Sequence, residues 1–319
     1  MSDPYTTTHE DWDPSDEPMP AELRAELVAP NVRKLVDPRT LAARFHHLKA
    51  AGQSGKHAML AFQGDGTDTL ARRLGSGAHA LLFGKPTALW DQPSKASQTK
   101  ARKGKTPSGK PSKAPRSGED WDKFQAQHAG AVILTAKEME AAKRIADAIH
   151  GNALAERLLF SPGTIHERSI IWSQLGRARQ STPDARGADH LVELKTTRCA
   201  APGKFKYDAE KLCYHAQVAD QRAAIAYETG GRAPREAFIV AVENVAPWCV
   251  TVFELLPSVL EAGERICATW LERLQIYEMT DMWGGYTSGI EPWELVDRGQ
   301  AIADPSWASD DNSNTEGED

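Results

Sequence analysis

The sequence lacks the features that mark several classes of protein. Its 319 residues include only four cysteines, Cys199, Cys213, Cys249 and Cys267, and no two of them form a C-x-x-C pair. This spacing fits neither a zinc site nor a disulfide framework in a chain this long, so we expect four reduced, partly buried thiols. No apolar run approaches the ~20 residues of a membrane-spanning helix, and the first residues do not form a basic-then-apolar signal peptide. We therefore expect a cytoplasmic protein with no membrane partner.

Basic residues are missing from both ends of the chain, and this changes the meaning of its net charge of −6. Residues 1–20 and residues 304–319 each contain six acidic side chains and neither Lys nor Arg. Without these twelve acids the net charge is +6. We expect both ends to be acidic disordered tails. The mildly basic body between them is compatible with a polyanionic substrate.

Acidic residues are in turn missing from residues 94–117, which are rich in Lys, Ser, Gly and Pro. Such a segment cannot bury a core, so we predict a basic flexible linker or loop. It divides an N-terminal helical part, residues 21–93, from a larger core at residues 118–297. The segment is either a solvated tether or an arm that grips phosphates, and both interpretations stay open.

Apolar periodicity predicts a mixed α/β fold. Helical spacing is found over five segments: Pro38–Ala51, Thr67–Phe83, Thr135–Leu159, Tyr207–Thr229 and Pro257–Tyr277. Strand patterns are found over four: Ile165–Trp172, His190–Thr196, Ala237–Val242 and Trp248–Leu255. Thr135 followed by Glu138 is typical of a helix cap. Gly75 and Gly77 cost a helix about 1 kcal/mol each, which indicates that something approaches that helix closely. The order predicts a mixed β-sheet flanked by helices, with the N-terminal helical part folded against it.

Two carboxylates and an ammonium group are predicted to meet on the strand His190–Thr196. Because side chains alternate along a strand, Leu191, Glu193 and Lys195 share one face. A Gly-containing turn precedes this strand, and Asp184 lies before that turn. The sequence therefore predicts that Asp184 lies beside Glu193 and Lys195.

Neighbouring carboxylates repel each other unless a cation lies between them, and their oxygen atoms suit Mg²⁺ or Mn²⁺. One or two such ions would activate a water molecule and neutralise a phosphoryl group. Lys195 would then orient the attacking water or stabilise the transition state. The alternative is an ordinary salt-bridged strand, since E-x-K alternation is common on solvated faces.

Several ordered motifs resemble the PD-(D/E)XK nuclease superfamily, and in particular its RecE-like (exodeoxyribonuclease VIII) phage exonucleases, which are relatives of lambda exonuclease and the RecB nuclease domain. The resemblance runs from about His57 to Trp293. The motifs are HAMLAFQ from His57, GSGAHALLF from Gly75, ILTAKEM from Ile133, His166-Glu167, Pro183-Asp184, ELKTT from Glu193, YHAQ from Tyr214 and FIVAVE from Phe238.

This resemblance implies roles for further residues. His79 matches a histidine that supplies a nitrogen ligand to the metal, and Glu167 matches an acidic residue that adds a metal or water-mediated contact. Gln217 matches a glutamine that positions substrate or the attacking water, and Tyr214 lies one turn before it on the same helix face. The sequence departs from the family at Gln221, where these exonucleases usually have tyrosine, and this difference concerns how the DNA end is seated rather than metal binding.

The resemblance implies a Mg²⁺-dependent deoxyribonuclease with two ions per site and Mn²⁺ as a substitute. The expected reaction is 5′-to-3′ digestion of linear duplex DNA, which leaves 3′ overhangs for phage-type homologous recombination. Its expected partners are a single-strand annealing protein and further copies of the chain in a trimer or tetramer. Two alternatives remain: an endonuclease or single-strand nuclease in defence or repair, and a catalytically inactive DNA-binding protein.

Overall fold

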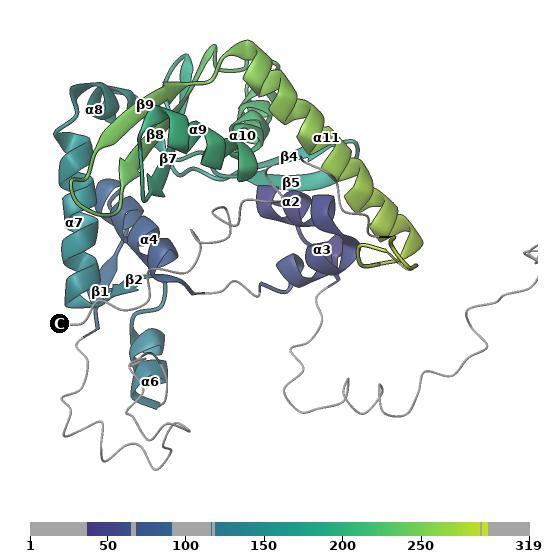
Figure 1. The fold of residues 1–319 in the computed structure, drawn as a ribbon, viewed down its shortest axis with the longest axis horizontal. Coiled ribbons are helices and arrows are strands. Elements are labelled where there is room, and N and C mark those ends of the chain that lie inside the picture. Colours follow the sequence, from purple (N-terminus) through teal and green to yellow (C-terminus); the bar gives the residue numbers. More distant parts are fainter. Residues whose placement is uncertain (1–36, 65–67, 91–115, 117–118, 288, 293–319) are drawn as a thin grey trace, which may run out of the picture.

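A computed structural model describes residues 37–64, 68–90, 116, 119–287 and 289–292 (Figure 1). The predicted acidic tails lie outside the described residues. So does the predicted basic segment, apart from Arg116.

A five-stranded mixed sheet forms the centre of the protein, in the order β3-β6-β7-β8-β9. Its strands are β3 (Ile165–His166), β6 (Ala185–Arg186), β7 (His190–Thr197), β8 (Glu236–Glu243) and β9 (Val250–Glu254). Strands β7 and β8 run parallel over their full length, and the other neighbours are antiparallel. The predicted mixed sheet flanked by helices is therefore confirmed, and β7, β8 and β9 lie within one or two residues of their predicted ranges.

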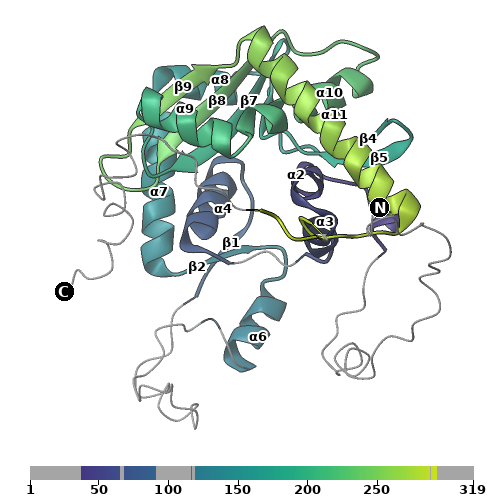
Figure 2. The same cartoon turned by 45° about the vertical axis from the view of Figure 1, so that its right-hand side comes forward.

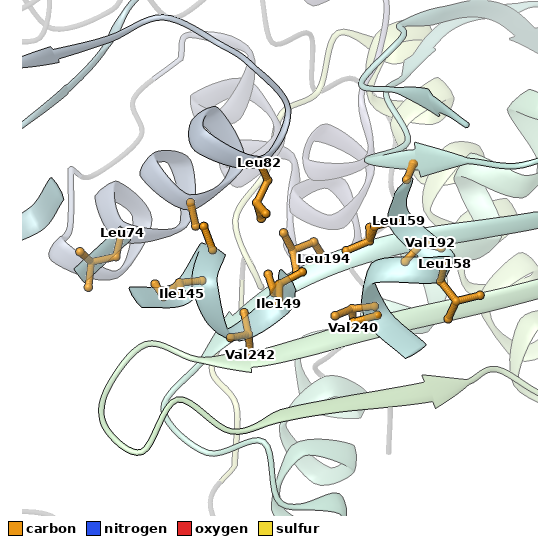
Figure 3. Close-up of a cluster of buried hydrophobic side chains, with 14 residues drawn as sticks. Leu74, Leu82, Ile145, Ile149, Leu158, Leu159, Val192, Leu194, Val240 and Val242 are labelled. Carbon is orange, nitrogen blue, oxygen red and sulfur yellow. The ribbon is translucent and has the colours of Figure 1, made fainter. Parts of the chain in front are cut away.

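One face of the sheet is covered by α4 (Leu70–Leu82), α7 (Ala136–His150) and α8 (Ala153–Phe160). Val192 and Leu194 of β7 point to this side and pack against Ile145 and Ile149 of α7. Figure 3 shows these side chains meeting in one apolar cluster. Burial of this continuous apolar surface stabilises the layer, because apolar area removed from water contributes roughly 25 cal/mol per Å².

The other face carries α9 (Pro202–Lys211), α10 (Tyr214–Glu228) and α11 (Pro257–Thr280). Leu191 of β7 points to this side and packs with Val218 of α10, as strand alternation predicts. Helices α10 and α11 cross closely at Gly263, where an added Cβ would lie 2.7 Å from the His215 carbonyl oxygen. Glycine at this crossing therefore lets α10 lie close against α11.

The N-terminal helices α2 (Phe45–Gln53) and α3 (Gly55–Phe62) lie beside the C-terminal part of α11 (Figures 1 and 2). They follow a short 3₁₀ turn, Pro38–Thr40, and bury Leu48 and Phe62 against Leu271 and Leu274 of α11.

A β-hairpin made of β4 (Ile170–Gln174) and β5 (Arg177–Ser181) joins this region to the sheet. Ala43 exchanges backbone hydrogen bonds with β5, and Arg177 forms an ion pair with Glu278 of α11. The remaining described elements are β1 (Thr87–Leu89), β2 (Val132–Leu134) and α6 (Glu119–Gln127).

Two of the predicted helices are divided. The segment Thr135–Leu159 breaks at Gly151 and Asn152, where the Asn152 side chain caps α8 by accepting from the Ala155 N–H at 3.0 Å. The segment Tyr207–Thr229 breaks at Cys213, which adopts a left-handed conformation with φ 56°. The Gly-Asn pair in the sequence indicates the first break, because these residues are typical of turns. No residue in the sequence indicates the second break, because cysteine is not typical of turns.

The predicted helix Pro38–Ala51 and the predicted strand Ile165–Trp172 are also too long. The helix is interrupted by extended backbone around Arg44 and begins again at Phe45. The strand is interrupted at Glu167, whose φ is 45°. A glutamate in the left-handed region is held there by its surroundings, so its conformation cannot be predicted from local preference.

The predicted cap of α7 is confirmed. Thr135 Oγ1 accepts from the Glu138 N–H at 3.3 Å, and Glu138 Oε2 accepts from the Thr135 N–H at 2.8 Å. Among the described residues, no helix combines the length and apolar character that crossing a bilayer requires.

Candidate active site

Strand β7 places Glu193 and Lys195 on the face that α10 covers, and the hairpin with β6 places Asp184 close by. Ala185 pairs with Val192, so Asp184 lies just outside this short ladder. Its Oδ2 accepts from the Leu194 N–H at 2.7 Å. The predicted meeting of Asp184 with the E-x-K strand is thus present in the fold.

Helix α10 directs two amide side chains at Glu193. Gln217 Nε2 donates to Glu193 Oε1 at 2.6 Å, and Gln221 Nε2 donates to Glu193 Oε2 at 2.7 Å. Because a carboxylate only accepts, these contacts set the orientation of both amides. Gln217 Oε1 therefore faces Lys195 Nζ, which donates to it at 2.9 Å.

Lys195 lies at the centre of these contacts. Its Nζ is 2.5 Å from Glu193 Oε1 and 4.8 Å from the centre of the Tyr214 ring. The ring face stabilises a cation at this distance. Tyr214 therefore contacts the lysine of the E-x-K motif in this structure.

His79, Glu167 and Asp184 form a second group at the same end of β7. His79 Nδ1 lies 3.5 Å from Glu167 Oε1 and 3.6 Å from Asp184 Oδ1. One ligand atom from each residue lies within 4.8 Å of the others, which is close enough for all three to hold one metal ion. The backbone contributes too, since the Glu167 N–H donates to the Asp184 carbonyl oxygen at 3.1 Å.

The close approach predicted from Gly75 and Gly77 is confirmed, and it explains how His79 reaches this group. An added Cβ at Gly77 would lie 2.8 Å from Leu134 Cδ1 of β2. At Gly75 it would lie 3.2 Å from Thr196 Oγ1 of β7. Helix α4 therefore lies close against the sheet, with His79 one turn further along.

The pKa values of Asp184, Lys195 and His79 show an excess of negative charge at the site. Burial, followed by the charge of Glu193, raises the pKa of Asp184 to about 7. Burial lowers the pKa of Lys195 and that of His79, but the neighbouring carboxylates outweigh it and both pKa values are raised. Asp184 therefore lacks enough neighbouring positive charge to favour its ionised form, and a divalent ion at the site would supply that charge.

The donor set fits Mg²⁺ or Mn²⁺. Two carboxylates and one imidazole can hold such an ion, with the remaining positions left for water and phosphate oxygen atoms. Glu193 lies outside this group of three, because Lys195, Gln217 and Gln221 contact its two oxygen atoms. Its part in metal binding stays a prediction.

A pocket of about 240 Å³ adjoins the two glutamines. Its lining includes Gln217, Gln221 and Thr182 from the core, together with Arg44 and His46 from the start of α2. Arg44 Nε donates to Gln180 Oε1 at 3.0 Å. The N-terminal helical part therefore contributes to the surroundings of the candidate site.

Two features of the site were not predicted from the sequence. One is the contact of Gln221 with Glu193, which depends on how α10 packs on the sheet. The other is Lys85, whose Nζ lies 2.7 Å from Glu167 Oε2. Gly84-Lys85 after an apolar helix is a signal for a helix end, but it does not reveal the partner of the lysine.

Comparisons with known proteins are consistent with this fold. No family model and no curated protein matches the sequence. A candidate exonuclease from Eubacterium rectale superposes with a TM-score of 0.52 at 11% sequence identity, covering 77% of this chain and 84% of that chain. LHK-Exo in complex with dAMP matches with a TM-score of 0.27 at 14% identity, covering 66% of this chain and 93% of that chain. The second likeness is too weak to support an argument, whereas the first shows that this chain shares a fold with the candidate exonuclease.

Proposed function

We propose that this protein is a Mg²⁺-dependent deoxyribonuclease that digests linear duplex DNA from its 5′ ends. The observation that carries the proposal is the meeting of His79, Glu167 and Asp184 beside the Glu193–Lys195 pair. This arrangement combines a cation site with a lysine held next to it, as hydrolysis of a phosphodiester requires.

In this proposal Asp184, His79 and Glu167 would hold the metal, and Glu193 is the further carboxylate that would bind it. The bound metal would lower the pKa of a water molecule and neutralise charge on the phosphoryl group. Lys195 then directs its ammonium group at the attacking water or at the developing charge on phosphate. Gln217 contacts both Glu193 and Lys195 and so positions them.

The pocket beside Gln217 supports action at a DNA end. Arg44 and Thr182, both in its lining, offer a guanidinium and a hydroxyl group to a phosphate. A terminal phosphate held there would stop the strand at a fixed distance from Lys195. The resemblance to RecE-like exonucleases adds the 5′ polarity, the 3′ overhangs and a role in phage-type recombination with an annealing partner. It also adds the trimer or tetramer and the two-ion site.

The proposal is tested by incubating linear and circular duplex DNA with the protein in Mg²⁺ and in Ca²⁺. We expect Mg²⁺-dependent loss of linear DNA alone. Lys195→Ala should reduce the rate at least about 100-fold, as removal of one preorganised donor does in other enzymes. Lys204→Ala is the matched control, because Lys204 forms a Lys–Asp pair on α9 and its loss should leave the rate unchanged.

Cutting of circular DNA would favour an endonuclease. Digestion of single strands alone would favour a single-strand nuclease. Binding without cutting in either metal would favour an inactive DNA-binding protein.

A further inference from the structure

Lys85 lies at the edge of the candidate metal site, and the end of α4 sets its position. Gly84 adopts φ 70° just beyond this helix, and the Lys85 N–H donates to the Ala80 carbonyl oxygen at 2.9 Å. This is the hydrogen bond of a helix that ends in a left-handed glycine. The helix that carries His79 therefore also positions the backbone of Lys85.

Glu167, the partner of Lys85, is positioned just as firmly. Its backbone has φ 45°, a conformation that a glutamate adopts only when its surroundings impose it. Its Oε1 faces His79, whereas its Oε2 lies 2.7 Å from Lys85 Nζ. Hence one carboxylate is shared between a candidate metal ligand and an ammonium group.

The two lysines of the site differ in how strongly they are held. The Lys195 side chain is 17% exposed and also contacts Gln217 and Tyr214. The Lys85 side chain is 49% exposed, and within the described part of the chain Glu167 is its single ion-pair partner. The Glu167 side chain is 12% exposed, so the pair is open to water on its lysine side alone. Water around the ammonium group weakens this ion pair, so a divalent ion would compete with Lys85 for Glu167.

We propose that Lys85 competes with the divalent cation for Glu167 and thereby lowers the metal affinity of the site. The inference rests on the proposed function, because it takes His79, Glu167 and Asp184 as metal ligands. With the metal absent, the Lys85 ammonium neutralises Glu167. Binding of a metal ion by Glu167 would have to overcome both this ion pair and the repulsion between the ion and the Lys85 ammonium group.

The test is a calorimetric titration of Mn²⁺ into the full-length protein without DNA, so that the readout is independent of cleavage. We expect Lys85→Met to bind Mn²⁺ about fivefold more tightly than the wild type, since a partly exposed ion pair contributes about that factor. Lys85→Arg keeps the charge and should bind as the wild type does. Lys204→Met removes an exposed Lys–Asp pair on α9, away from the site, and serves as the control.

Equal or weaker Mn²⁺ binding by a folded Lys85→Met protein would overturn the inference. Lys85 would then hold Glu167 in position rather than compete with the metal for it. Thermal melting establishes folding, and Lys85→Gln replaces the variant if Lys85→Met does not fold. Failure of the proposed function looks different. In that case neither the wild type nor Asp184→Asn binds Mn²⁺, and both proposals fall together.

Discussion

At the scale of the residue, Glu193 makes several contacts in the candidate site. Its side chain is 3% exposed, and it receives hydrogen bonds from Lys195, Gln217 and Gln221. A buried carboxylate is costly unless donors satisfy it. The three donors therefore satisfy both carboxylate oxygen atoms of Glu193 and fix its orientation.

Gln221 occupies a position where the exonucleases that the sequence resembles usually have tyrosine, so the effect of removing its side chain is informative. We expect Gln221→Met to slow DNA cleavage by about tenfold, because a hydrogen bond to a charged group contributes about 1.5–3 kcal/mol. The measurement is the initial rate on linear duplex DNA at saturating Mg²⁺. Gln275→Met is the control, since Gln275 donates to the Leu175 carbonyl oxygen at the tip of the hairpin, and its rate should equal that of the wild type. An unchanged rate for Gln221→Met would mean that Glu193 needs only Lys195 and Gln217.

At the scale of elements, the start of α7 links this helix to α4. Glu138 completes the cap of α7 and forms ion pairs with Arg73 of α4 and with Arg116. Since α4 carries His79, this junction also supports one wall of the candidate site. Burial raises the pKa of Glu138, but the Thr135 N–H and the two arginines outweigh it, so the pKa lies below its usual value.

This depressed pKa predicts a pH-dependent stability. A carboxyl group whose pKa is lower in the folded protein stabilises it at every pH above the unfolded pKa, and that contribution is lost as pH falls through the folded pKa. We expect Glu138→Gln to lower the free energy of unfolding by about 2 kcal/mol at pH 7, in line with lost hydrogen bonds to charged groups. The difference should shrink below about pH 4.5, the usual glutamate pKa.

Chemical denaturation of both proteins at pH 7 and pH 4 checks this. Glu140→Gln, on the same helix, removes an exposed pair with Arg144 and should change little at either pH. A difference that stays the same at both pH values would contradict the expectation.

At the scale of the whole molecule, basic residues are concentrated in the predicted segment 94–117, which ends close to the fold. Arg116 is the one described residue of this segment, and it donates to the Ile133 carbonyl oxygen and to Glu138 while lying over the Trp121 ring. Arg116 therefore has a structural role. If the segment grips phosphates, its other seven Lys and Arg residues are the ones that would contact them.

We therefore expect deletion of residues 95–115, with Arg116 retained, to weaken DNA binding in Ca²⁺ and to flatten its salt dependence. Each phosphate contact that is lost should reduce the slope of log K against log salt by about 0.9. The matched control replaces the seven basic residues by Ser or Gln at constant length, and it should behave like the deletion. An unchanged slope of log K against log salt would show that the segment does not contact phosphates and serves as a solvated tether.

What the sequence alone determined was local. The alternation along residues 190–197 assigned Glu193 and Lys195 to one face of a strand, and Thr135 with Glu138 marked where a helix begins. Both depend on residues a few positions apart, whose geometry follows from backbone periodicity and capping chemistry. The mixed sheet could be predicted because the helical and strand patterns occur along the chain in an order that few folds accommodate.

Only the tertiary structure decided which groups share the site. Lys85 meets Glu167, and Gln221 meets Glu193, across elements far apart in the chain. The left-handed backbone of Glu167 and Cys213 is likewise imposed by packing, since neither residue prefers it. Distances between such groups are set by how the helices pack on the sheet. The close approach of α4 at Gly75 and Gly77, for example, brings His79 to Asp184. No local sequence pattern contains that information.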